Sequence, residues 1–376
     1  MPRPKRILFA CGGTAGHINP ALAVADAAKE RWPDIQIMFA GNPKGMEARL
    51  IPAAGYDFTP IEVLGFQRKL AFRNLRNNIM AVLYLLTVSR KAERIIGEFD
   101  PDICMGTGGY VSGPMVRTAA KLKIPTLTHE QNAFPGVTTR LLCKYVDKAL
   151  LAVPRAAEHL PGGTKYVVTG NPVRREVLTA ERKAAREKLG VGDKVCLLSF
   201  GGSLGARRVN EAIADVMALQ HDKGRVHHIH ATGQHGQELF LKLLAERGVD
   251  ITTNPDIDLR AYIDDMPDCL AAADLVICRA GAISISELQV AGRASILIPS
   301  PNVAGNHQYY NARLLSAKNA AILIEEKDLE GNRLASVVDG LVSDPQEIAN
   351  IGRNAAGMAI TDAPERILRE IENLLL

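Results

Sequence analysis

Two short glycine-rich segments of the same design are the strongest candidates for chemistry in this sequence of 376 residues. GGTAG at Gly12–Gly16 follows the apolar run Ile7–Cys11, and GGSLG at Gly201–Gly205 follows the apolar run Cys196–Phe200, 189 positions later. A buried strand, a tight glycine turn and a helix can hold a phosphate group against the helix N-terminus. Tight strand-to-helix packing explains such glycines equally well. Neither segment continues as a Gly-Lys-Ser/Thr loop or as a dinucleotide-binding G-x-G-x-x-G sequence.

Side chains that could take part in a reaction accompany these glycines. Thr14 and Ser203 occupy matching positions, where a hydroxyl can join backbone N–H groups in binding an anionic oxygen. His17 opens the helix after the first segment, from where it can accept the proton of an incoming hydroxyl group. The alternative is that His17 only packs against the helix start or caps it.

Two further clusters follow strand-like runs in the first half of the chain. GTGGYVSGP at Gly106–Pro114 follows Ile103–Met105, and HEQN at His129–Asn132 closes the run that begins at Thr126. Polar groups at the carboxyl end of a strand lie where open α/β sheets bind their ligands. An ordinary hydrogen-bonded loop is the alternative for His129–Asn132.

The second half contains a segment suited to a nucleotide diphosphate. In Arg279–Glu287, backbone N–H groups at a helix start could face a diphosphate, and Glu287 could accept hydrogen bonds from two ribose hydroxyls. A structural carboxylate in the first helical turn would have the same sequence. The amides of Asn306–Ala312 suit sugar hydroxyls because an amide both donates and accepts.

The sequence predicts neither a metal site nor a cofactor. The nearest approach to an Asp-x-Asp metal motif is Asp264–Asp265, and adjacent side chains point in different directions. We therefore expect the charge of a diphosphate to be met by backbone dipoles and by Arg174.

The groups named above must be positioned by the surrounding strands and helices. Short apolar runs alternate with amphipathic stretches along the chain, and this alternation predicts parallel sheets covered by helices. The strands expected in the first half are Ile7–Ala10, Ile35–Ala40, Ile103–Met105, Thr126–His129, Lys148–Val153 and Tyr166–Thr169, with helices that include Ala21–Arg31 and Gly113–Leu122. Those expected in the second half are Val195–Phe200, His227–Ala231, Leu275–Cys278, Ser295–Ile298 and Ala321–Ile324.

The connections between these series are also predicted. The alternation of strands and helices in the first half stops at Thr169–Arg174, which is the expected hinge. One charged helix is expected next, over Arg175–Leu189, and it ends at Gly190. Pro364–Leu376 is an amphipathic helix that could pack on either half, with Pro364 at its first position.

Composition narrows the class of protein further. Apolar residues make up 47% of the chain and the net charge is +4, which favours a well-buried core and does not indicate a nucleic-acid-binding protein. The six cysteines form no C-x-x-C pair, as expected for buried thiols in a reducing compartment. The apolar run at the N-terminus stops at Gly12, too soon for a signal peptide. The basic, apolar segment Phe66–Phe99 could lie on an anionic membrane surface or could be a core helix with solvated charges.

Seven motifs in order resemble the family 28 glycosyltransferases of peptidoglycan synthesis, and they span nearly the whole chain. They are GGTAGHINPALA at Gly12–Ala23, GGYVSGP at Gly108–Pro114, HEQNAFPG at His129–Gly136, GNPVR at Gly170–Arg174, GGSLGA at Gly201–Ala206, CRAGAISISE at Cys278–Glu287 and HQYYNA at His307–Ala312.

The resemblance implies an α/β protein with two Rossmann-like domains facing a cleft (the GT-B fold) and a C-terminal helix that crosses back to the N-terminal domain. Residues 1–170 with about 358–376 would form the acceptor and membrane-facing domain, and 171–357 the donor-binding domain. The reaction implied is inverting, metal-independent transfer of N-acetylglucosamine from UDP to the muramyl 4-hydroxyl of the undecaprenyl-linked precursor, lipid I. The product would be lipid II, made by a peripheral protein at the cytoplasmic face of the cell membrane.

Site residues follow from the same resemblance. His17 matches the proposed base, Ile263 would bind uracil through its backbone, and Glu287 would bind the ribose. The other donor-site positions are Thr14, Ala15, Gly16, Asn132, Arg174, Ser203, Ala282, Ile283, Ser284, Ile285, Ser286 and Gln308, and the acceptor-site positions are Gly12, Gly13, Gly108, Gly109, Tyr110 and Ser112. The implied partners are UDP-N-acetylglucosamine, lipid I, an anionic membrane surface through Phe66–Leu86, and other cell-wall synthesis proteins; no cofactor is implied.

Two positions depart from the family pattern. Ala15 stands where glycine is usual and Leu204 where glutamine is usual, and we expect both to tune binding. The alternative functions are transfer to another lipid acceptor such as diacylglycerol, epimerisation of UDP-N-acetylglucosamine on the same fold, and nucleotide-sugar binding without turnover.

Overall fold

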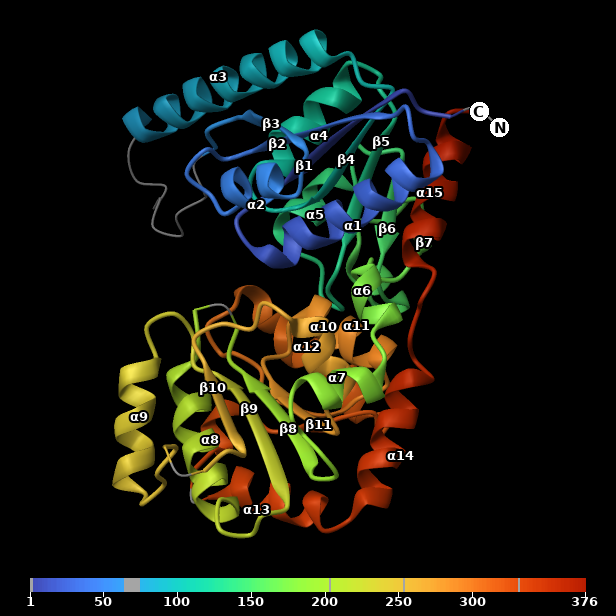
Figure 1. Cartoon of the computed structure of the whole chain (residues 1–376). Coiled ribbons are helices and arrows are strands. Elements are labelled where there is room, and N and C mark those ends of the chain that lie inside the picture. The colour runs from blue at the N-terminus through green and yellow to red at the C-terminus, as the bar shows by residue number, and fades with distance from the viewer. Residues whose placement is uncertain (1–2, 64–74, 203, 253, 331) are drawn as a thin grey trace. The chain divides into compact units, whose positions relative to one another are not determined.

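The computed structural model describes residues 3–63, 75–202, 204–252, 254–330 and 332–376, with the side chains described from residue 87 onward in the helix that begins at Leu75. The chain divides into two compact units. The first comprises Met1–Val173 and Ile360–Leu376, and the second comprises Arg174–Ala359. Each unit is an α/β domain built on its own parallel sheet (Figure 1).

The first unit contains a seven-stranded sheet in the order β3-β2-β1-β4-β5-β6-β7. Its strands are β1 (Arg6–Cys11), β2 (Gln36–Gly41), β3 (Asp57–Pro60), β4 (Ile103–Gly108), β5 (Thr126–Glu130), β6 (Lys148–Leu151) and β7 (Tyr166–Val168). Its helices are α1 (Ala15–Arg31), α2 (Glu47–Ala53), α3 (Leu75–Phe99), α4 (Ser112–Lys121), α5 (Val137–Leu142), the 3₁₀ turn Pro154–His159 and α15 (Ala363–Leu374).

The second unit contains a six-stranded sheet in the order β10-β9-β8-β11-β12-β13. Its strands are β8 (Val195–Phe200), β9 (Val226–Ala231), β10 (Ile257–Arg260), β11 (Leu275–Cys278), β12 (Ala294–Leu297) and β13 (Ile322–Leu323). Its helices are α6 (Arg175–Thr179), α7 (Arg182–Lys188), α8 (Arg207–Gln220), α9 (Gln237–Glu246), α10 (Met266–Ala272), α11 (Ala282–Ala291), α12 (His307–Ser316), α13 (Arg333–Val342) and α14 (Pro345–Ala356), with 3₁₀ turns at Ala304–Asn306 and Glu326–Asp328.

The C-terminal helix belongs to the first unit, as the resemblance implied. In α15, Ile367, Leu368 and Ile371 are buried and share a hydrophobic cluster with Ile18 of α1 and Phe9 of β1. Figure 1 shows α15 lying beside α1, although the two helices are at opposite ends of the sequence. The amphipathic pattern of this segment therefore reflects burial against the first unit.

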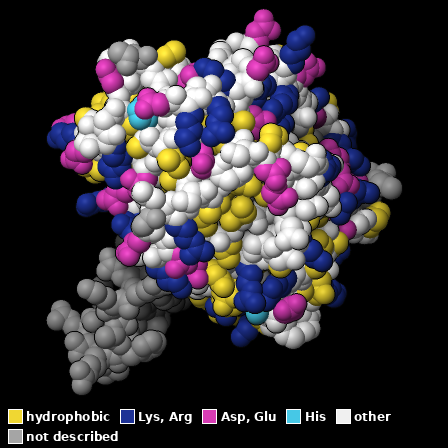
Figure 2. All heavy atoms as spheres, turned by 90° about the horizontal axis from the view of Figure 1, so that it is seen from below, with side chains coloured by type: hydrophobic (Ala, Val, Ile, Leu, Met, Phe, Trp, Pro, Cys, Tyr) yellow, Lys and Arg dark blue, Asp and Glu magenta, His cyan; other side chains and the backbone are white. Residues whose placement is uncertain are grey.

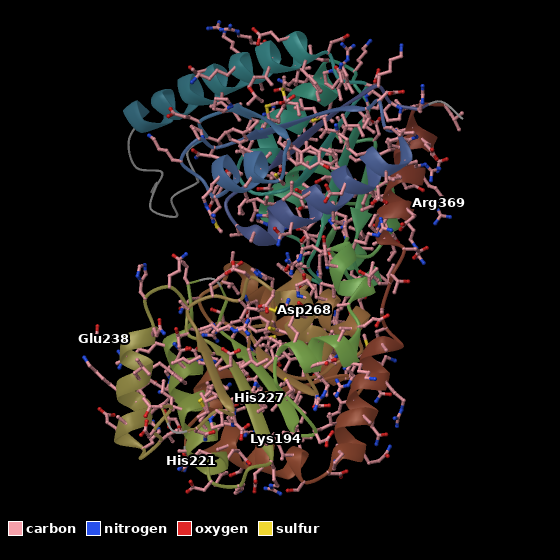
Figure 3. All side chains as sticks on the ribbon, in the orientation of Figure 1. Lys194, His221, His227, Glu238, Asp268 and Arg369 are labelled. Atoms are coloured by element: carbon pink, nitrogen blue, oxygen red, sulfur yellow. The ribbon has the colours of Figure 1, made fainter. Side chains whose placement is uncertain are left out.

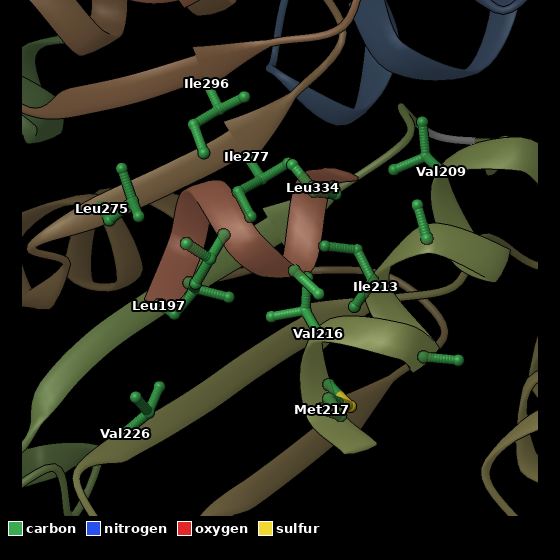
Figure 4. Close-up of a cluster of buried hydrophobic side chains, with 14 of the residues drawn as sticks. Leu197, Val209, Ile213, Val216, Met217, Val226, Leu275, Ile277, Ile296 and Leu334 are labelled. Atoms are coloured by element: carbon green, nitrogen blue, oxygen red, sulfur yellow. The ribbon is translucent and has the colours of Figure 1, made fainter. Parts of the chain in front are cut away.

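The core of the second unit lies between its sheet and the covering helices (Figure 4). Leu197 of β8, Ile277 of β11 and Ile296 of β12 are fully buried, and Ile213 of α8 and Leu334 of α13 pack in the same cluster. On the face shown in Figure 2, basic and acidic side chains are interspersed, in keeping with the small net charge.

Three expectations about the elements need correction. The helix predicted over Arg175–Leu189 is two helices, α6 and α7, because Ala180 has an extended backbone (φ −64°, ψ 127°). Helix α1 begins at Ala15, six residues earlier than predicted, and contains Pro20 within it. Strands β3 and β10 were not predicted, since DFTP and IDLR lack a continuous apolar run.

Candidate functional site

The first glycine segment is built around a buried carboxylate, Glu47 of α2. Its Oε2 accepts a hydrogen bond from the backbone N–H of Gly13 at 3.0 Å, and its Oε1 accepts one from Asn42 at 3.0 Å. Glu47 is 1% exposed, and a methyl group at Gly12 would overlap its Oε1. Gly13 has a φ of +85°, which only glycine adopts readily. The carboxylate therefore explains Gly12, and the backbone conformation explains Gly13.

The backbone of the same turn orients His17. The imidazole Nδ1 lies 3.0 Å from the carbonyl oxygen of Gly12 and 3.4 Å from Oγ1 of Thr14. A carbonyl oxygen can only accept, so Nδ1 carries the proton and neutral His17 presents the Nε2 lone pair. The Thr107 hydroxyl donates to the His17 carbonyl at 2.7 Å and so fixes the backbone of the same residue. This tautomer suits a general base that acts through Nε2.

Thr14, Ala15 and Gly16 lie where the sequence placed them, at the start of α1. Thr14 is the N-cap residue, with an extended backbone (φ −147°, ψ 154°), and its side chain makes no capping hydrogen bond. Thr14 and Gly16 are exposed and Ala15 is partly exposed. The N-terminal turn of α1 is thus accessible, and its backbone N–H groups suit an anionic or sugar oxygen.

The second glycine cluster packs directly on this turn. Gly108 (φ +112°) faces His17, so that a methyl group there would lie 2.6 Å from Cδ2 of the imidazole. A methyl group at Gly109 would overlap the carbonyl oxygen of Gly12. Ser112 is fully buried. Its hydroxyl lies within donating distance of two carbonyl oxygens, those of Ala10 (2.6 Å) and Gly108 (2.7 Å).

These contacts assign internal roles to part of the predicted acceptor site. The close approach to His17 and Gly12 explains Gly108 and Gly109, and Ser112 holds the turn from inside. Tyr110, by contrast, is 52% exposed. Its side chain is therefore open to solvent, unlike that of Ser112.

The HEQN segment is tied to the hinge of the chain. Nε2 of His129, which is fully buried, lies 2.9 Å from the carbonyl oxygen of Gly170, and Nδ1 lies 3.1 Å from Nε2 of Gln131. The Asn171 amide donates to the Gln131 carbonyl at 3.2 Å. Burial lowers the pKa of His129, so this histidine is neutral and acts as a structural link.

Asn132, predicted to contact the donor sugar, is held by Glu130. Oε1 of Glu130 accepts hydrogen bonds from both the backbone N–H and the side-chain amide of Asn132, each at 3.0 Å, and Oε2 accepts from the N–H of Gly136. The carboxylate thereby shapes the turn that presents Asn132 after β5.

In the second unit, the structure joins two of the predicted donor-site residues. Arg174 donates to Oε1 of Glu287 from Nε (3.2 Å) and Nη2 (3.0 Å). Glu287 lies in α11 and is 7% exposed. Burial raises the pKa of its carboxyl group, and the Arg174 guanidinium opposes that shift.

The other predicted donor-site residues of the second unit lie at the start of α11, in α12 and after β10. Ala282, Ile283, Ser284, Ile285 and Ser286 form the first turns of α11 after Gly281, whose backbone is extended. Oε1 of Gln308 accepts from the N–H of Ser300 at 2.9 Å, which orients its amide in α12. Ile263 is buried in the connection between β10 and α10.

The groups that pack against the second glycine segment differ from those that pack against the first. A methyl group at Gly201, the counterpart of Gly12, would lie 2.5 Å from the backbone nitrogen of Ala206, so the following turn occupies the space that a carboxylate fills beside Gly12. Leu204 is 76% exposed. Ser203 lies outside the described residues, as do the side chains of Phe66–Leu86, the predicted membrane-facing segment.

No three His, Cys, Asp or Glu side chains of the described residues come together in an arrangement that could hold a metal ion. No helix among them combines the length and the apolar character needed to cross a membrane.

Sequence reasoning missed Glu47. The available signal was the set of glycines at 12, 41 and 45, because methyl groups at these positions would all meet the Glu47 side chain.

Comparison with known proteins connects these features to a family. The glycosyltransferase family 28 N-terminal domain matches residues 7–151, and the family 28 C-terminal domain matches residues 196–367. A relative from Acetivibrio thermocellus is 41% identical over 98% of both chains. One from Caldanaerobacter subterraneus is 40% identical over 98% of this chain and all of its own. Both are named UDP-N-acetylglucosamine–N-acetylmuramyl-(pentapeptide) pyrophosphoryl-undecaprenol N-acetylglucosamine transferase.

Solved structures agree with this relationship. MurG of Acinetobacter baumannii is 28% identical, with a TM-score of 0.77 over 98% of this chain and all of that one. The UDP complex of S. aureus MnaA, 14% identical with a TM-score of 0.67, shares the fold alone. The two parallel-sheet domains, their GT-B neighbours and the two matched domains give one conclusion: the chain belongs to glycosyltransferase family 28.

Proposed function

We propose that the protein transfers N-acetylglucosamine from UDP-N-acetylglucosamine to the 4-hydroxyl of the muramyl sugar of lipid I, giving lipid II and UDP. Relatives about 40% identical over nearly the whole chain are named for this transfer. The single observation in the site that carries the proposal is the contact between Nδ1 of His17 and the carbonyl oxygen of Gly12. It leaves Nε2 of the neutral imidazole able to take the proton of an attacking hydroxyl.

The reaction proposed is a single displacement with inversion. The acceptor oxygen bonds to the anomeric carbon while the bond from that carbon to the β-phosphate oxygen breaks. The hydroxyl proton moves to Nε2 of His17, and the bonding electron pair leaves with UDP. No metal ion is part of the proposal; Arg174 and the backbone N–H groups at the start of α11 supply the positive charge for the diphosphate.

Binding of the donor nucleotide is assigned to the second unit. Glu287 is fixed by Arg174 and can accept hydrogen bonds from ribose hydroxyls through its remaining lone pairs. Gln308 and Asn132 would contact the sugar, and Ile263 the uracil. We also propose that the protein works as a peripheral protein at the cytoplasmic face of the cell membrane, where its lipid acceptor is.

One assay separates this function from its alternatives. The full-length protein is incubated with UDP-N-acetylglucosamine and a short-chain lipid I analogue, and UDP and the disaccharide product are measured. Transfer only to diacylglycerol, release of free N-acetylmannosamine, or UDP-sugar binding without turnover would each overturn the proposal.

The role of His17 is tested in the same assay. His17→Ala is expected to lower turnover by roughly 10²–10⁴-fold, the usual contribution of a positioned general base. The affinity for UDP, measured by calorimetry, should stay close to the wild-type value. Turnover close to wild type would remove His17 from the mechanism.

A further inference from the structure

We infer that Glu47 sets the basicity of His17 through the single peptide group that lies between them. The inference rests on the proposed role of His17 as the base and adds a positioning residue to it. The peptide group that joins Gly12 to Gly13 makes both hydrogen bonds. Its N–H donates to Oε2 of Glu47 at 3.0 Å, and its carbonyl oxygen accepts from Nδ1 of His17 at 3.0 Å.

This arrangement is a linear chain from carboxylate to peptide to imidazole. A carboxylate that accepts from an amide N–H polarises the amide and places more negative charge on its carbonyl oxygen. The carbonyl then binds the Nδ1–H more strongly, and most strongly when the imidazole is protonated. The pKa of His17 is thereby raised relative to the same ring without the carboxylate, and Nε2 becomes a stronger base.

The surroundings of Glu47 hold its carboxylate in a fixed position. Its second oxygen, Oε1, accepts from the N–H of Asn42, so both oxygens are hydrogen-bonded and the carboxylate cannot swing away from Gly13. Methyl groups at Gly12, Gly41 and Gly45 would all collide with the Glu47 side chain. Glycines in the first glycine segment, at the end of β2 and in the loop after β2 therefore leave space for this one carboxylate, which is almost completely buried.

Burial keeps two nearby titratable groups, Cys11 and His129, neutral. The Cys11 thiol lies beside Glu47, and burial raises its pKa, so it stays neutral over the working range. On the side of β4, Thr107 and Gly108 contact His17, and His129 beyond Gln131 is held neutral because burial lowers its pKa. Two hydrogen bonds through the Gly12–Gly13 peptide connect the Glu47 carboxylate to the imidazole.

Glu47 takes up no proton in this scheme. The proton of the acceptor hydroxyl goes to Nε2 of His17, and the Glu47 carboxylate stabilises the imidazolium that forms. It is a positioning residue that acts through His17 and does not touch substrate.

The test is Glu47→Gln, which keeps the size of the side chain and removes its charge. The pKa of His17, followed by NMR and assigned by comparison with His17→Gln, should fall by roughly one pH unit, as expected for removal of one nearby charge. The acid limb of the kcat–pH profile should move down by the same amount, while the rate on the plateau falls because the base is weaker.

Glu372→Gln is the matched control. Glu372 is also a buried carboxylate of the first unit with two hydrogen bonds, donated by Arg31 at 3.0 and 2.9 Å, and it lies in α15. Its loss should lower stability and leave both the His17 pKa and the acid limb in place. If Glu47→Gln does the same, Glu47 is only structural and the inference is wrong.

A second measurement needs no variant of Glu47. The ¹⁵N shifts of neutral His17 in the wild-type protein should show the tautomer with the proton on Nδ1, and a proton on Nε2 would overturn the inference. Because both NMR readouts are independent of turnover, they stand even if His17→Ala remains active. That outcome would reject the proposed base without deciding the effect of Glu47 on the imidazole.

Discussion

The guanidinium of Arg174 donates two hydrogen bonds to one carboxylate oxygen of Glu287, although 113 positions separate these residues in the chain. Arg174 is the first residue of the second unit, and Glu287 lies in the helix proposed to bind the nucleotide. The pair therefore fixes the start of the second unit to α11.

Arg174→Ala should destabilise the protein more at high pH than at low pH. Burial already raises the pKa of Glu287, and loss of Arg174 raises it further. A carboxyl group with a raised folded-state pKa favours folding at low pH, and that contribution is lost as the pH rises through the folded-state value. We expect a loss of about 1–3 kcal/mol in unfolding free energy at pH 8 and less at pH 5, measured by urea denaturation. The double variant Arg174→Ala/Glu287→Gln should show a smaller difference, and equal losses at both pH values for the single variant would contradict the argument.

Gly108→Ala should disable the enzyme by displacing an imidazole. The new methyl group would lie 2.6 Å from Cδ2 of His17, at a backbone φ of +112°. Turnover should fall at least tenfold in the transfer assay. Gly163→Ala is the matched control, since Gly163 also has a positive φ (+80°) but open space around its Cβ position. It should lose about 1 kcal/mol of stability from backbone strain and keep its turnover. Equal turnover in both variants would show that His17 tolerates the displacement.

The second unit should lose stability as the pH falls below about 6.5, the ordinary histidine pKa. Burial lowers the pKa of both His228 and His230 in β9 to about 3. A histidine with a lowered folded-state pKa stabilises the fold above its unfolded-state value, and this contribution is lost as the pH falls towards the folded-state value. Each such histidine contributes up to about 1.4 kcal/mol per pH unit. Figure 3 shows that neighbouring His227 also lies on β9, within the second unit.

His228→Leu should flatten this pH dependence. Neither ring nitrogen of His228 has a hydrogen-bond partner among the described residues, so leucine also removes two unsatisfied polar atoms. Unfolding free energies from pH 7.5 to 4.5 should fall less steeply than in the wild type, with no loss at pH 7.5. His235→Leu, at an exposed position, should keep the wild-type slope. A His228→Leu slope as steep as the wild type would locate the pH dependence elsewhere.

Ile367→Ala should weaken the first unit specifically. Ile367 of α15 is fully buried in the cluster that contains Phe9 and Ile18, so its truncation should cost about 2–5 kcal/mol. Hydrogen exchange should show lower amide protection in β1 and α1, with β8 and α8 unchanged. Leu376→Ala, at a residue that is 85% exposed, should change stability by less than about 0.5 kcal/mol. Loss of protection in both units would mean that they do not unfold separately.

The strands that support the site could be predicted because their signal is local. Ile7–Cys11 and Cys196–Phe200 are apolar runs followed by glycines, and both are buried strands in the structure. Strands β3 and β10 lie at the edges of their sheets and are partly polar, so no local pattern marks them. The break between α6 and α7 was missed because Ala180 has no property that ends a helix.

The side chains of the site were harder to predict than the elements that hold them. The position of His17 at a helix start follows from the sequence, but the ring nitrogen that carries its proton depends on the Gly12 carbonyl folding back onto it. Glu47 contacts Gly13 from 34 positions away. Arg174 and Glu287 were each assigned to the substrate, and their contact with one another depends on the packing of α11. Contacts of this kind are properties of tertiary structure.

The division of the chain has a consequence for its synthesis. The second unit is one continuous segment inserted between Val173 and Ile360, whereas the first unit needs residues from both ends of the chain. Ile367, Leu368 and Ile371, which complete its core, leave the ribosome after the whole second unit. Domains normally fold in the order in which they emerge. Here the order of completion is reversed, because the unit that begins first cannot close its core until the whole second unit and the segment after it have been made.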